Sequence, residues 1–214
     1  MPVSRSKIQK YLGMNVDYTV SGIARISILG YIGELLTVFD KMGPRNCGTK
    51  YSTAPENLFK VDEDCEKLSP DKAKGFHNMV AKTLYTTKRA RPDTCTSVAF
   101  LTNRVRKPNT DDWKNLAHLM NYLRKTRNLQ LILGAGSTGI LRVHNGGGLS
   151  TGRGFLIVTY TKQNINTRIS TEAEIVGVDD CILEVCWIHY FLETHNYNVT
   201  LIYFFPGQPK RHTA

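Results

Sequence analysis

The amino-acid sequence predicts an α+β fold, because segments with the two-residue alternation of strands and segments with helical spacing both occur along the chain. Its 214 residues are 41% hydrophobic, which is enough to bury a core, and 21% charged. Lys and Arg total 28 against 18 Asp and Glu, which gives a net charge of +10. This excess favours a polyanionic partner such as nucleic acid.

The N-terminal residues, 1–42, predict a β-hairpin followed by a helix. Strand-like alternation over 8–18 leads to a turn at Val20-Ser21-Gly22 and to a return strand over 23–28. Apolar residues at helical spacing follow between 31 and 39.

Residues 43–128 predict a connecting loop over 43–68 and then three helices. The helices begin at Ser69-Pro70, at Pro92-Asp93 and near Asn109, where proline or a capping residue stands before a periodic run. The third helix has the clearest apolar stripe, which indicates core packing and is formed by Trp113, Leu116, Met120 and Leu123.

Residues 129–214 predict an α/β segment. Strands are expected over 129–133, 155–160 and 198–205, with one long helix over 170–194. A glycine-rich stretch separates the first two strands.

Three short motifs in this segment match known functional patterns, but we do not expect them to have the corresponding functions. The G-x-G-x-x-G pattern at 134–139 needs a following helix, which the glycines at 146–148 would break. Asp179-Asp180 lies in a helical pattern, where adjacent side chains diverge by ~100°. Cys181 and Cys186 diverge by ~140° on the same helix, so we predict no zinc site.

Cysteine usage and hydropathy predict the compartment. The five cysteines are scattered and odd in number, and a polar, basic segment precedes them instead of a signal peptide. We therefore expect free thiols in an intracellular protein, cytoplasmic or nuclear. No apolar run approaches the ~18 residues that span a bilayer, so we expect no membrane partner.

Two basic clusters bracket the second predicted helix. Clusters at helix ends suit contacts with phosphates, and a solvated surface explains them equally well. The candidate nucleic-acid-binding residues are Lys88, Arg89, Arg91, Arg104, Arg106 and Lys107.

Several segments follow one another in a specific order: Tyr11-Leu12-Gly13-Met14, then 88–101, 112–127 and 162–180. This order resembles the C-terminal part of a copia-type retrotransposon polyprotein, over nearly the whole chain. The resemblance implies three segments. They are the end of a reverse transcriptase palm (1–42), a linker with thumb or connection-like helices (43–128), and a truncated ribonuclease H-like segment (129–214).

The resemblance also implies which carboxylates catalysis would need. The family's polymerase aspartates precede the segment that Tyr11-Leu12-Gly13-Met14 resembles, and residues 1–10 hold no acid. Ribonuclease H uses carboxylates from separate elements around two Mg²⁺ ions. Glu174 matches the family's helix glutamate, but the two aspartate positions have no counterpart here. A missing stretch after Arg142 would explain one of them and would leave strands with an exposed edge.

Glu174 also forms a T-x-x-E capping box with Thr171, and we expect it to act as the cap. We therefore expect no metal site and no cofactor in this chain, although the parent family uses Mg²⁺. The expected function is a non-catalytic fragment that binds an RNA–DNA hybrid or other nucleic acid weakly. The alternatives are an active ribonuclease H, which would use Glu174 with unrecognised ligands or with carboxylates from a second chain, and a decayed product with no function.

Overall fold

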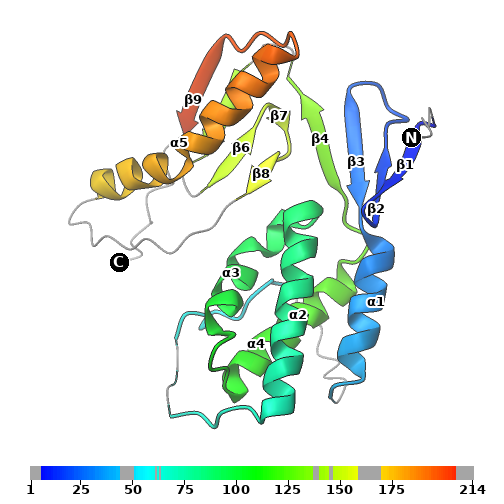
Figure 1. The fold of residues 1–214 in the computed structure, drawn as a ribbon, viewed down its shortest axis with the longest axis vertical. Coiled ribbons are helices and arrows are strands. Elements are labelled where there is room, and N and C mark those ends of the chain that lie inside the picture. The colour runs from blue at the N-terminus through cyan, green and yellow to red at the C-terminus, as the bar shows by residue number, and fades with distance from the viewer. Residues whose placement is uncertain are drawn as a thin grey trace. The chain divides into compact units, whose positions relative to one another are not determined.

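The computed structural model describes residues 6–43, 51–60, 62, 64–136, 140–144, 147–158 and 170–205. Figure 1 shows its helices and strands. The chain divides into two compact units, Met1–Thr19 with Arg25–Leu131 and Val20–Ala24 with Ile132–Ala214. Strands and helices occur in both, so the predicted α+β class is confirmed. Within the described ranges, no helix is both long and apolar enough to cross a membrane.

The first unit begins with the antiparallel strands β1 (Ile8–Tyr11) and β2 (Met14–Asp17) and with most of β3 (Ile23–Ser27), from Arg25 onward. The single strand predicted over 8–18 is wrong, because a two-residue turn at Leu12-Gly13 divides it. Both turn residues have positive φ, 49° and 75°, which is typical of a tight hairpin turn. The alternation rule missed it because leucine rarely adopts this conformation.

Four helices follow in the first unit: α1 (Leu29–Asp40), α2 (Pro70–Arg89), α3 (Cys95–Arg104) and α4 (Thr110–Lys125). A short 3-10 turn, η1 (Pro92–Thr94), precedes α3 at the predicted start of the second helix. The predicted helices are thus confirmed, and α2 contacts the other three. Three residues of the predicted stripe on α4, Leu116, Met120 and Leu123, are fully buried.

In the second unit, the strands and the long helix are β4 (Leu131–Ala135), β5 (Ile140–His144), β6 (Gly148–Ser150), β7 (Gly152–Arg153), β8 (Ile157–Val158), α5 (Ser170–Thr194) and β9 (Leu201–Phe205). β8, β6, β5 and β9 form a sheet in that order, in which β9 is parallel to β5 and the other pairs are antiparallel. β4 pairs with β7.

The β5–β6 hairpin was not predicted, because the glycines around it suggested an irregular stretch. β5 nevertheless alternates buried and half-buried residues, and Gly147 has a φ of 92° in the connection. Glycine permits this conformation, and the chain can then reverse its direction. The predicted helix over 170–194 is confirmed.

Candidate nucleic-acid interface

The β1–β2 turn packs against the C-terminal half of α2. The Tyr85 hydroxyl donates a hydrogen bond to the carbonyl oxygen of Leu12. The Tyr85 ring also lies against Tyr31 of α1, with 5.1 Å between ring centroids. The Arg89 guanidinium lies over the Tyr85 ring, 5.6 Å from its centroid. The fold therefore joins the turn and the basic end of α2 in one surface, which we call the turn–helix surface (Tyr11, Leu12, Tyr85, Lys88 and Arg89).

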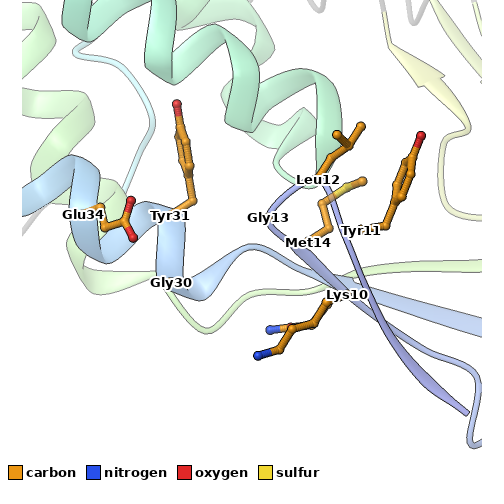
Figure 2. A pocket seen from close by; sticks show the side chains of 9 residues that line it. Lys10, Tyr11, Leu12, Gly13, Met14, Gly30, Tyr31 and Glu34 are labelled. Atoms are coloured by element: carbon orange, nitrogen blue, oxygen red, sulfur yellow. The ribbon is translucent and has the colours of Figure 1, made fainter. Parts of the chain in front are cut away.

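A hollow of about 460 Å³ lies beside the turn. Figure 2 shows Tyr31 and Glu34 projecting from α1, and Tyr11, Leu12 and Met14 from the hairpin. Tyr11 is 62% exposed and Leu12 is 51% exposed, so the tip of the hairpin presents apolar surface to solvent. The remaining lining residues are Lys10, Gly13, Asn15 and Gly30.

The tyrosines at this surface differ in environment. Partial burial, with Tyr85 and Glu34 as neighbours, raises the pKa of Tyr31. Its phenol therefore keeps its proton at neutral pH and can donate a hydrogen bond. Tyr11 is exposed at the tip, where its ring can stack on another flat group.

Two of the six predicted phosphate contacts lie at the end of α2. Lys88 and Arg89 are exposed in the last turn of this helix. Cations are favoured there by the helix dipole, so both positions are stable sites for positive charge. Arg106 and Lys107 are also exposed, beyond the end of α3.

Arg91 has a structural role. Its side chain is 1% exposed and its Nη2 lies 2.7 Å from the Asp93 carboxylate. The guanidinium also donates to the carbonyl and hydroxyl oxygens of Thr126, at 3.1 and 2.7 Å, and lies over the Tyr122 ring. Because the fold uses these donors internally, we leave Arg91 out of the proposed interface.

Arg104 is also paired within the fold. Its Nε lies 3.0 Å from Asp112, whose carboxylate is 4% exposed. Asp112 forms the capping box of α4 with Asn109, which orders the start of that helix. Arg104 therefore neutralises a buried helix cap, and the exposed candidates are Lys88, Arg89, Arg106 and Lys107.

The predicted catalytic position lies on α5. Glu174 belongs to that helix, but its side chain and that of Thr171 lie outside the described residues. Their capping box is therefore untested and stays a prediction. All six carboxylates that follow Asp112 belong to α5, namely Glu172, Glu174, Asp179, Asp180, Glu184 and Glu193.

The structure describes part of the G-x-G-x-x-G pattern and the residues considered for zinc binding in and directly after α5. Residues 137–139 of the G-x-G-x-x-G pattern lie outside the described residues, and strand β5 follows where a dinucleotide site needs a helix. Cys181 is buried and its thiol donates to the carbonyl of Val178. His195 Nδ1 lies 2.8 Å from the carbonyl oxygen of Phe191.

One group of potential metal ligands was missed by the sequence interpretation. Asp62, Cys65 and Asp111 place their donor atoms within 4.8 Å of one another, in the part of the chain that the structure describes. The Cys65 thiol donates to Asp111 at 3.0 Å and to Asp62 at 3.4 Å, and Lys114 Nζ lies 2.6 Å from Asp111. Hydrogen bonds and an ion pair thus satisfy this cluster, which links the loop to α4.

Comparison with known proteins shows a distant similarity to a transposon protein. The chain is 23% identical over 202 residues to a Saccharomyces cerevisiae protein whose name assigns it to the transposon Ty5-1. The match covers 84% of this chain but 62% of that protein, so the chain spans less than two thirds of its relative. No family model and no solved structure matches. The chain is thus distantly similar, over most of its length, to a transposon protein.

Proposed function

We propose that this chain is a retroelement-derived fragment that binds nucleic acid through the turn–helix surface. The observation that carries the binding proposal is the contact of Tyr85 with both Leu12 and Arg89. This contact places exposed aromatic and apolar groups of the hairpin beside the exposed cations of α2.

The chemistry of this surface suits a polynucleotide. Lys88 and Arg89 can neutralise phosphates, and Tyr11 can stack on a base. The net charge of +10 would attract a polyanion from a distance. Because the contacts are few and exposed, binding is expected to be weak and to depend strongly on salt.

The retroelement part of the proposal rests on the similarity to the transposon protein and on the order of the segments. Within it, we assign the chain to the end of a copia-type reverse transcriptase and a truncated ribonuclease H segment. The proposal includes an intracellular location, requires no cofactor, and assigns no catalysis to Glu174.

Fluorescence anisotropy with a labelled RNA–DNA hybrid tests the binding proposal. The affinity of the wild-type chain is expected to fall as salt rises from ~50 to ~200 mM. In the double variant Lys88→Gln and Arg89→Gln, the slope of log K against log salt should become shallower by about 0.9 for each lost phosphate contact. The matched control is Lys72→Gln with Lys74→Gln, the same charge change at two exposed positions near the start of α2. Equal effects of the two pairs, or no salt-sensitive binding at all, would refute the proposed interface.

A further inference from the structure

The sheet of the second unit has two faces of different character. On β5, Leu141 and Val143 are buried against α5, whose residues Cys181, Val185 and Ile188 complete the core. In Figure 1, α5 crosses this face of the strands. Alternation along a strand then directs Ile140, Arg142 and His144 to the opposite face.

The opposite face carries aromatic rings. β9 is parallel to β5 with Tyr203 beside Arg142 and Phe205 beside His144, so these side chains share one face. The His144 ring stacks on Phe205 with centroids 4.9 Å apart and meets Phe155 edge-on at 5.1 Å. We call this group the open face (Arg142, His144, Phe155, Tyr203 and Phe205).

The rings of the open face are accessible. Tyr203 is 51% exposed, Phe205 is 41% exposed and Phe155 is 38% exposed. A ligand that covers these rings would remove their apolar surface from water. This burial would contribute favourable free energy to binding.

Glycine in the neighbouring strand fixes the position of one ring. A Cβ atom built on Gly148 would lie 2.6 Å from the Phe155 ring, closer than any real contact. Gly148 is paired with His144 across β5 and β6, so Phe155 lies directly over the strand beside the histidine. The absence of a side chain at Gly148 thus allows the ring to lie against the sheet.

The charge of the open face complements a polyanion. The second unit carries all its Asp and Glu residues on α5, the helix that covers the other face. Arg142 is the cation of the open face, and no acid occurs in the strands around it. An occupant with flat apolar rings and negative charge therefore fits both properties.

We propose that the open face is a second nucleic-acid site, specific for single strands, whose bases stack on Tyr203, Phe205 and Phe155 while Arg142 contacts a phosphate. Unpaired bases expose their flat faces, whereas those of a duplex are already stacked on one another, so single strands are selected. The site lies in a different unit from the turn–helix surface and stands independently of it.

The test uses the full chain carrying Lys88→Gln and Arg89→Gln, which removes the turn–helix surface from the measurement. The probe is a single-stranded oligonucleotide of about 12 nucleotides containing 2-aminopurine, whose fluorescence is quenched on stacking. Tyr203→Ala and Phe205→Leu are each expected to raise Kd about fivefold or more and to reduce the quenching, because each removes one stacking ring. Tyr203→Phe, which keeps the ring, should retain the affinity, and unchanged circular dichroism spectra of Tyr203→Ala and Phe205→Leu show that their loss of affinity is not due to unfolding.

The matched control is Phe191→Ala, which removes an aromatic ring that is 47% exposed on α5. It is expected to change Kd by less than about twofold, since it lies outside the open face. The proposal is overturned if Phe191→Ala weakens binding as much as Phe205→Leu, or if the open-face variants leave Kd unchanged. A change in mass by light scattering with unchanged Kd would overturn it in favour of self-association.

Discussion

At the scale of single residues, the surroundings of a basic side chain decide its role. Arg91 and Arg89 are two positions apart in one basic cluster, yet Arg91 is 1% exposed and Arg89 lies at the surface. Arg91 fixes η1 to the end of α4 through Asp93 and Thr126. A cation buried in that position contributes to folding and is not accessible to a ligand.

Replacing Arg91 should destabilise the first unit. Arg91→Met is expected to lower the free energy of unfolding by about 2–4 kcal/mol, because it removes charge-assisted hydrogen bonds and leaves Asp93 without its cationic partner. Urea unfolding followed by circular dichroism measures the change. Arg106→Met, at an exposed position, should change stability by less than about 0.5 kcal/mol. Similar losses for both variants would contradict the structural role of Arg91.

The thiol of Cys65 should respond to pH in an unusual range. Hydrogen bonding to Asp111, with desolvation and Asp62 next, raises its pKa from 9.0 to about 11. The folded state therefore binds this proton more tightly than the unfolded state does. The resulting stabilisation is fully present below about pH 9 and is lost as the pH rises through about 11.

Alkylation of Cys65 by iodoacetamide, followed by mass spectrometry, tests this pKa. At pH 9 the reaction should be slow in the wild type, because the thiolate is the nucleophile, and faster in Asp111→Asn. Asp71→Asn makes the same change in the first turn of α2 and should leave the rate as it was. An unaltered rate in Asp111→Asn would show that Asp111 does not control the thiol.

At the scale of elements, helix starts depend on local chemistry. Asn109 accepts a hydrogen bond from the Asp112 amide, and Asp112 accepts one from the Asn109 amide. The Asn109 side chain also donates to the carbonyl of Asp62, which ties the preceding loop to α4. This capping box is therefore both a helix start and a contact between distant segments.

Removing the cap should weaken α4. Asn109→Ala is expected to lower stability by about 1 kcal/mol, because an N-terminal amide of the helix loses its acceptor. Thermal unfolding followed by circular dichroism would show a lower Tm. Asn115→Ala, inside the same helix, is the control and should be neutral or slightly stabilising, since alanine favours helices. Equal effects at both positions would argue against a specific cap.

At the scale of the whole molecule, the placement of the acids bears on catalysis. A two-metal site needs carboxylates from separate elements. Here the acids of the second unit all belong to one helix, so this unit provides no carboxylate from a second element. The ribonuclease H-like assignment of this unit is a proposal about ancestry, and no cleavage activity follows from it.

We expect no cleavage of a labelled RNA–DNA hybrid by the purified chain with Mg²⁺ or Mn²⁺ at high protein concentration. Wild type and Glu174→Gln should give the same result, because the second unit provides no carboxylate on an element other than α5. Gel electrophoresis of the labelled RNA strand provides the readout. Metal-dependent cleavage that Glu174→Gln abolishes would establish the alternative, an active ribonuclease H.

The sequence by itself determined the class of fold and the helices. Ser69-Pro70 and Asn109 mark helix starts by local chemistry, and the stripe on α4 is buried as its spacing predicts. These features depend on neighbours within one or two turns, so a local pattern is enough to find them.

Only the tertiary structure decided which residues meet. The turn at Leu12 depends on a positive φ that leucine rarely adopts, and its contact with Tyr85 joins residues 73 positions apart. Contacts with residues that are distant in sequence also bury Arg91, whereas Arg89 stays exposed. The basic composition predicted a polyanionic partner, and long-range packing determines which of the candidate cations are exposed at the surface.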